Sequence, residues 1–179
     1  DITLPAHMNR GDLCTGIYTW NAEFVNCRFS EIPYVYPVKI RGIKSRVENC
    51  HFTNMDWWAN PGGGAAELGN IARYVTFENS KVGGLGGSHL MEYCRIEDFK
   101  DPCDCSGINR GAHGAPRSMT RYNWIINGPG ANGIRIDGGA NGAGNRRGDI
   151  HHIITIGNNR GMRLKGDFHD VHHITAYDN

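Results

Sequence analysis

The sequence predicts an all-β fold, a parallel β-helix solenoid built as one domain over residues 1–179. The composition favours short strands and tight turns, because Gly (25 residues), Asn (17) and Ile (17) are abundant whereas Leu (6) is scarce. Short segments also recur: "NCRF" at 26–29 returns as "NCHF" at 49–52, and "DIHHI" at 149–153 returns as "DVHHI" at 170–174. Within each unit apolar and polar residues alternate, as they do along a half-buried strand.

The repeat length indicates that each unit is one coil. The offsets of 23 and 21 residues between those segments are too long for a hairpin and too short for a strand–helix–strand unit. We therefore expect coils of about 21–23 residues that hydrogen-bond to one another and stack equivalent side chains.

The coils can be followed in chain order. "GIYTWN" at 16–21 and "PVKIRG" at 37–42 are the first strands, with Val38 and Ile40 pointing inward. The last coils contain "GIRIDG" and "GMRLKG", 28 residues apart, and the two His-His strands. A ladder inside or beside a turn is expected from the Asn and Cys residues at strand ends: Asn26, Cys27, Asn49, Cys50, Cys94 and Asn123.

Three segments are too long and irregular for turns, and we expect them to be inserted loops. They are residues 55–70, 98–118 and 138–149. The third holds about seven extra residues, since the GIRI-type units are 28 residues apart and the His-His units only 21. Such loops either wall a groove on the flank of the solenoid or connect strands without a further role, and the sequence leaves both open.

The units "GIRI", "HHI" and "N-C-x-F" resemble those of the right-handed parallel β-helix superfamily of pectate-lyase-like proteins. The resemblance covers most of the chain but matches no single family's motif. It implies right-handed coils. Because that superfamily includes many polysaccharide lyases, it also implies an exported protein that acts on carbohydrate.

Composition excludes several other classes. A formal net charge of +1 does not point to nucleic acid, and no apolar run is long enough to span a membrane. The Gly-rich runs lack the Lys-Ser/Thr of a phosphate-binding loop. Six cysteines fit either a few disulfides or a stack of buried thiols. We expect a secreted or cell-surface protein whose signal peptide has already been removed.

The stacked "GIRIDG" and "GMRLKG" strands predict a charged patch on the outer face of one sheet. Their aliphatic residues point inward, which places Arg135 beside Arg163 and Asp137 beside Lys165. The second pair fits an ordinary cross-strand ion pair. Two adjacent arginines, however, cost stability unless an anion joins them, and the carboxylate of an acidic sugar would do so.

The same face is expected to hold the rest of a polysaccharide chain. Equivalent outward positions in earlier coils carry aromatic, basic and amide side chains, and one loop adds two tryptophans on which sugar rings stack well. The predicted substrate-binding residues are Tyr18, Trp20, Lys39, Arg41, Asn109, Trp57 and Trp58. Trp124, in "RYNWII", is expected to pack in the core.

The cations fit a β-elimination that cleaves an anionic polysaccharide, the chemistry that the resemblance implies. We predict Lys165 as the base, held partly deprotonated by neighbouring cations, with Arg163 and Arg135 neutralising the uronate carboxylate. Asp137 or Asp167 is expected to tune the lysine or to hold a calcium ion.

Other candidates lie nearby. His169 and His113 are candidate acid–base groups in loops beside the charged strand. Asp137 and Asp167 could instead be the carboxyl pair of a glycoside hydrolase, a hypothesis we rank below elimination because the patch is richer in cations. Further acids for that chemistry are Glu92, Glu97 and Asp101.

A non-catalytic function is the alternative. The final coil stops part-way through "HHITAYDN" without an obvious cap, which fits a segment of a surface fibre, filament or adhesin that stacks end to end.

Four histidines are expected to stack in pairs, His151 on His172 and His152 on His173. A zinc site needs three or four convergent ligands, whereas a ladder of like side chains is the commoner result in a solenoid. We therefore predict a ladder and no metal site.

Overall fold

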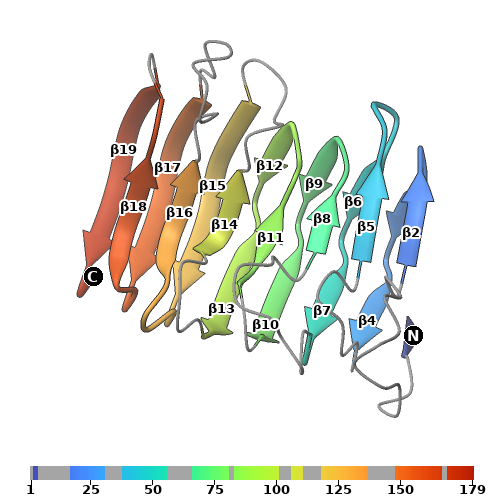
Figure 1. The fold of residues 1–179 in the computed structure, drawn as a ribbon, viewed down its shortest axis with the longest axis horizontal. Coiled ribbons are helices and arrows are strands. Elements are labelled where there is room, and N and C mark those ends of the chain that lie inside the picture. The colour runs from blue at the N-terminus through green and yellow to red at the C-terminus, as the bar shows by residue number, and fades with distance from the viewer. Residues whose placement is uncertain are drawn as a thin grey trace.

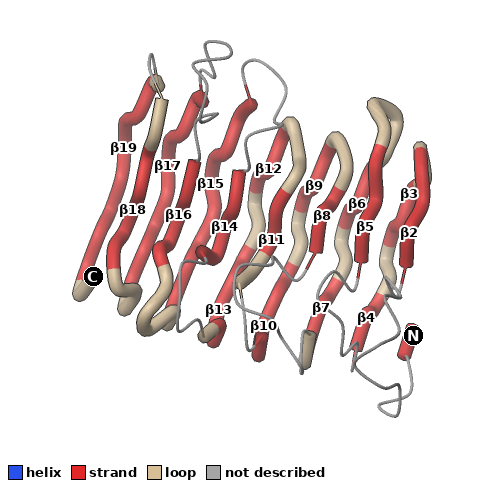
Figure 2. Tube along the Cα trace, in the orientation of Figure 1, coloured by secondary structure: helices blue, strands red, loops and turns tan. Residues whose placement is uncertain are grey.

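The protein is a parallel β-helix, as the repeats predict. The computed structural model describes residues 2–3, 17–30, 38–55, 66–80, 83–100, 106–110, 118–136, 148–166 and 169–179. All the strand pairs among these residues are parallel. The strands lie side by side along the long axis, with the first and last coils at opposite ends (Figure 1). The described residues form strands and turns (Figure 2), and none of them belongs to a helix that could cross a membrane.

One side of each coil contributes a strand to a seven-stranded sheet. Its strands are β2 (Ile17–Trp20), β5 (Val38–Arg41), β8 (Ala66–Leu68), β11 (Leu85–Gly86), β14 (Ser106–Arg110), β16 (Asn132–Ile136) and β18 (Arg160–Leu164). Val38 and Ile40 are buried, as predicted, and so are Ile134 and Ile136 of the "GIRIDG" unit.

The rest of each coil lies in a twelve-stranded sheet whose two rows of strands meet at β15 (Ser118–Ile126). One row contains β3 (Glu23–Val25), β6 (Arg46–Glu48), β9 (Ile71–Arg73) and β12 (Leu90–Glu92). The other contains β1 (Ile2–Thr3), β4 (Arg28–Ser30), β7 (His51–Thr53), β10 (Thr76–Ser80) and β13 (Arg95–Phe99). The long strands β17 (Gly148–Ile156) and β19 (Asp170–Tyr177) extend both rows beyond β15.

A single residue in the left-handed conformation forms the corner between the two rows. These residues, which we call the corner ladder, have φ between 50° and 57° and are Asn26, Asn49, Tyr74, Tyr93, Tyr122, His152 and His173. Asn and His tolerate this conformation better than most side chains, whereas Tyr is unusual there. The neighbouring coils hold the corner in place, since its N–H donates to the next coil, as from Tyr93 to Arg121 at 3.3 Å.

The side chains of the corner ladder stack on the outside of the solenoid. The Asn49 amide donates to Asn26 Oδ1 at 2.6 Å. From Tyr74 to His173, successive ring centroids are 4.5–5.2 Å apart. The contact of Asn49 with Asn26 and the stacking of His152 and His173 are as predicted, and three stacked tyrosines lie between these two pairs along the corner ladder.

The corner also resets the alternation of inward and outward side chains. In β15 the corner residue is Tyr122, so the next residue, Asn123, points inward and is fully buried. Trp124 then points outward and is 48% exposed. The prediction that Trp124 packs in the core is therefore wrong, because alternation without a corner residue assigns the wrong face to this strand.

The core is a column of aliphatic and aromatic side chains. Phe29 and Phe52 stack with centroids 4.4 Å apart, and Phe77 follows at 6.4 Å. All three are fully buried, and so is Ile96, which is in register with Phe77 in the next coil. Equivalent residues of successive coils therefore stack inside the solenoid as well as on its surface.

Coil length varies more than the repeats predict. Residues in register are 21 apart from Ile17 to Val38, as expected, but 19 apart from Ala66 to Leu85 and 28 from Ile134 to Met162. Two of the expected loops contain strands: β8 lies within 55–70, and β14 lies within 98–118. The strands keep their places in the sheet while the surrounding chain absorbs the difference in length.

Three cysteines follow corner residues on the inside of the solenoid, and all three are free thiols: Cys27, Cys50 and Cys94. Cys50 and Cys94 are buried, whereas Cys27 is half-buried. Burial also raises the pKa of the Cys50 thiol, and the thiolate is the reactive form.

We expect iodoacetamide to modify Cys27 well before Cys50 or Cys94 in the folded protein. Site-resolved peptide mass spectrometry at mildly alkaline pH measures the three rates, and unfolding in urea should make them similar. Equal rates in the folded protein would contradict the buried stack.

Candidate functional site

The predicted charged patch lies on the outward face of the seven-stranded sheet. Arg135 of β16 is in register with Arg163 of β18, and Asn109 of β14 is in register with Arg135. Both arginines are half-buried. The stacking predicted for this arginine pair is confirmed, and strand spacing holds their α-carbons about 4.8 Å apart.

The row that contains these residues runs along the whole sheet. We call it the outer row, and its successive register positions are Tyr18, Lys39, Glu67, Gly86, Asn109, Arg135 and Arg163. The predicted order of aromatic, cation and amide positions along one face is therefore confirmed. What the sequence did not reveal is the acidic position at Glu67, because residues 55–70 were expected to be a loop.

The predicted residues do not converge on one point. Tyr18 and Trp20 lie on β2, whereas Arg163 and Lys165 belong to the coil at the other end of the sheet. Six strand spacings separate these ends, which corresponds to about 29 Å. The face is an extended strip, along which a polymer could contact several coils at once.

The aromatic end of the strip is open to solvent. Tyr18 is 50% exposed and Trp20 is 60% exposed. Trp20 is in register with Arg41, whose guanidinium carbon lies 5.9 Å from the centre of the Tyr18 ring. Lys39 lies beside Tyr18 in the outer row. An exposed aromatic surface beside two cations can stack on a sugar ring and attract its negative groups.

The other end of the strip presents an exposed lysine. Lys165 directly follows β18, and its N–H donates to the Ile136 carbonyl at 2.9 Å. Its own carbonyl accepts a hydrogen bond from His169 Nε2 at 3.0 Å. The backbone of Lys165 is therefore held on both sides while its side chain is exposed.

His169 is tied to the backbone through both ring nitrogens. Gly148 N–H donates to Nδ1 at 3.0 Å, so Nδ1 carries a lone pair, and Nε2 donates to the Lys165 carbonyl. Through these two bonds the imidazole joins β17 to the chain after β18. In this arrangement His169 positions Lys165 and has no ring nitrogen free for acid–base work.

Several predicted residues lie outside the described part of the chain. They are Trp57, Trp58, Asp101, His113, Asp137 and Asp167. The predicted contact between Asp137 and Lys165 and the calcium site at Asp137 or Asp167 accordingly remain predictions.

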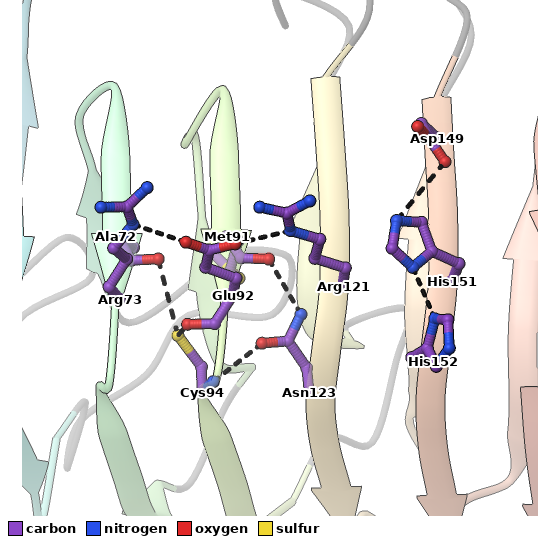
Figure 3. Close-up of polar contacts among 10 residues, drawn as sticks. All are labelled: Ala72, Arg73, Met91, Glu92, Cys94, Arg121, Asn123, Asp149, His151 and His152. Atoms are coloured by element: carbon purple, nitrogen blue, oxygen red, sulfur yellow. Dashed lines mark hydrogen bonds and ion pairs between the residues drawn. The ribbon is translucent and has the colours of Figure 1, made fainter.

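Two of the predicted acids, Glu92 and Glu97, are described, and both are paired with arginines. Glu92 is almost completely buried between Arg73, at 2.6 Å, and Arg121, at 2.5 Å (Figure 3). Glu97 lies 2.6 Å from Arg95 on the same strand. Both carboxylates are engaged by arginines and lie on the twelve-stranded sheet, so neither is placed to act as the general acid of a glycoside hydrolase beside Arg135 and Arg163.

The histidine pairs lie on the outer face of the twelve-stranded sheet, away from the strip. The ring centroids of His151 and His172 are 4.9 Å apart, and those of His152 and His173 are 4.5 Å apart. The stacking is as predicted. The sequence did not show that the two histidines of each strand also contact each other, because regular alternation would place them on opposite faces.

The pKa of His151 is lowered, mainly by burial. Asp149 acts in the opposite direction and raises it, while His172, His152 and Arg121 lower it further. Loss of hydration likewise lowers the pKa of His152, as do its neighbours in the last strand. Both imidazoles therefore favour the neutral form.

Comparison with family models, with curated proteins and with solved structures finds no match. The chain is thus classified by its architecture alone, as a parallel β-helix solenoid with a basic strip along one sheet.

Proposed function

We propose that this protein binds an anionic polysaccharide along the strip on its seven-stranded sheet and cleaves it by β-elimination. The single observation that carries the proposal is the register of Arg135 with Arg163, which places two outward, half-buried guanidinium groups on adjacent coils. Arginine binds carboxylate and sulfate groups through paired hydrogen bonds, so two in a row suit a polymer with a repeated negative charge.

The length of the strip supports a polymeric substrate. Coils are spaced by about 4.8 Å, close to the length of one sugar unit in an extended chain. A polysaccharide lying along the solenoid axis would place successive sugars over successive coils. The aromatic end near Tyr18 and Trp20 would then bind sugars several units away from the arginines. A polymer of this kind is found outside cells, which fits an exported protein.

Elimination assigns the chemistry to the basic end of the strip. The arginines would neutralise the uronate carboxylate and so acidify the neighbouring C–H bond. Lys165 would take that proton while a carbon–carbon double bond forms and the bond to the next sugar's oxygen breaks. The protonated lysine could then return a proton to the leaving oxygen. The resemblance of the repeats to pectate-lyase-like proteins supports the same chemistry.

The test is an activity assay on the uronate polymers pectate and alginate, following the ultraviolet absorbance of the unsaturated product. A sulfated galactan, which has no uronate, is the substrate control and should give no product. Lys165→Ala should lower the rate at least about 100-fold, the usual contribution of a general base. Arg163→Ala should also weaken binding of the intact polymer, measured by affinity electrophoresis.

Arg28→Ala is the matched control, because it removes an exposed arginine from β4 of the other sheet. It should leave both binding and turnover unchanged. Absence of product from both uronate polymers, together with unchanged binding in Arg163→Ala, would rule out the proposal.

A second candidate is a stiff structural module of a surface fibre, filament or adhesin. The observation that favours it is the corner ladder, because its rings stack from Tyr74 to His173 over five successive coils and resist bending of the solenoid. Electron microscopy of the native material separates the two candidates. End-to-end rods without lyase activity would favour the module.

A further inference from the structure

Four imidazoles meet at the corner of the last two coils. His151 and His152 lie on β17, His172 and His173 lie on β19, and His151 is in register with His172. Within each strand the two rings are close, with Nδ1–Nδ1 distances of 2.7 Å in β17 and 2.6 Å in β19. The cluster therefore forms a square of side chains, two along each strand and two across it.

The left-handed corner is what brings these rings together. Ile150 and Ile153 both point into the core, so a regular strand could expose only one of the two residues between them. His152 has φ of 53° and His173 has φ of 52°. At these corners two successive side chains emerge on the same outer side, which regular alternation does not allow.

We propose that this cluster binds a divalent first-row transition-metal ion of the kind that prefers imidazole, with Zn²⁺ as the reference ion. One ligand nitrogen from each of His152, His172 and His173 lies within 4.8 Å of the others, and all three side chains are exposed. The proposal is independent of the polysaccharide strip, which lies on the other sheet.

The spacing is close to what coordination requires. Two nitrogens bound at 2.0–2.1 Å to one tetrahedral ion lie about 3.3 Å apart. Rotation of the exposed side chains can bring the rings to that separation. The two nitrogens within each strand must move slightly apart, and those that are up to 4.8 Å apart must move closer. The corner backbone can stay where the neighbouring coils hold it.

Each pair contains a nitrogen lone pair that an ion can take in place of the hydrogen bond within the pair. Two Nδ1 atoms at this distance can share only one hydrogen, so at least one nitrogen of each pair is unprotonated. Neutral imidazole nitrogen is the form that binds zinc, nickel and copper. The cluster contains no thiolate or carboxylate within the group of three, which favours these ions over calcium or magnesium.

An acidic residue supports the cluster from the side. Asp149 Oδ1 lies 4.0 Å from His151 Nε2 (Figure 3) and accepts no hydrogen bond from any residue that the structure describes. A carboxylate facing the far nitrogen of a histidine orients the ring and strengthens it as a ligand. His151, which is nearly buried, is therefore either a fourth ligand or the group that fixes the other three.

The chain itself supplies a substitution that keeps the fold. Tyr occupies the corner in three consecutive coils and stacks directly on His152. His152→Tyr with His173→Tyr should therefore preserve the column while removing two ligands. His51→Gln is the matched control, since His51 lies on β7 and pairs with Glu78 at a distance of 2.9 Å.

Isothermal titration of the untagged full chain with Zn²⁺ tests the proposal. We expect one tight site per chain, an affinity lowered at least about 100-fold in the double tyrosine variant, and no change in His51→Gln. Cu²⁺ added to the wild type should give an electron paramagnetic resonance spectrum with coupling to several imidazole nitrogens.

Equal Zn²⁺ affinity in the wild type and the double variant would overturn the proposal, as would a Cu²⁺ spectrum with a single nitrogen. If the double variant fails to fold, His172→Gln removes one exposed ligand from the edge of the cluster without touching a corner. It should show the same direction of change, and an unchanged affinity there would count equally against the site.

Discussion

Replacing Phe52 with alanine is expected to lower the free energy of unfolding by about 3–5 kcal/mol. Phe52 is fully buried between Phe29 and Phe77, with centroids 4.4 Å and 6.4 Å away. Truncation removes the apolar surface of a whole ring and leaves a cavity between two rings fixed by separate coils. Those coils cannot close the gap, since backbone pairing sets the distance between them.

Urea denaturation followed by circular dichroism measures this loss. Phe52→Leu is the control that keeps most of the volume, and it should lose less than about 1.5 kcal/mol. Tyr18→Ala, on the exposed face, should stay within about 0.5 kcal/mol of the wild type. A loss below about 1 kcal/mol for Phe52→Ala would mean that the core column is not packed as described.

Replacing Glu92 with glutamine is expected to lower the free energy of unfolding by about 3 kcal/mol. The loss is close to that of Phe52→Ala, although glutamine keeps the shape of the glutamate side chain. Glu92 is 5% exposed, and one carboxylate oxygen faces Arg73 while the other accepts a hydrogen bond from Arg121. That hydrogen bond also raises the pKa of Arg121. The glutamine side chain has no charge to balance the two guanidinium groups beside it. Its oxygen can accept a hydrogen bond from one arginine, but its NH₂ group can only donate and would face the other.

Two controls separate charge from packing. Glu97→Gln breaks the ion pair with Arg95, whose side chain is 53% exposed, and should cost less than about 1 kcal/mol. A triple variant with Arg73→Met, Glu92→Leu and Arg121→Met should recover most of the stability lost in Glu92→Gln, because no unpaired charge remains. Equal losses in Glu92→Gln and Glu97→Gln would contradict a special role for the buried carboxylate.

The fold could be predicted because the same pattern of residues recurs in successive coils of a solenoid. "NCRF" and "NCHF" share a corner asparagine, an inward cysteine and an inward phenylalanine, so one coil predicts the next. The register of Arg135 with Arg163 follows from the same logic. The strands at β8 and β14 were harder, since insertions around them hide the repeat length and only the backbone pairing shows where each strand re-enters the sheet.

The side chains at the corner could not be assigned from alternation. A residue with positive φ shifts every later side chain of its strand to the other face, and no sequence rule marks Tyr122 as such a residue. Trp124 was assigned to the core although it lies on the outer face, and the contact between His151 and His152 does not follow from alternation either. Both features arise at the corner, and the metal-binding proposal depends on it.

The separation of the predicted binding residues also has a simple reason. In a solenoid, distance along the axis follows distance along the sequence, so Tyr18 and Arg163 cannot approach each other. Side chains in one row are aligned along the axis, but those on distant coils stay far apart. Sequence repeats thus predict the direction of a binding surface better than they predict the composition of a compact site.

In the corner ladder the backbone conformation does not depend on the type of side chain. Hydrogen bonds to the adjacent coils hold the corner geometry, and Asn, Tyr and His all occupy it at nearly the same φ. Mutation can therefore exchange an amide, a phenol and an imidazole at these positions with little change to the coil. The side chains of the corner ladder can therefore change one coil at a time in evolution and acquire new chemistry, while the fold stays the same.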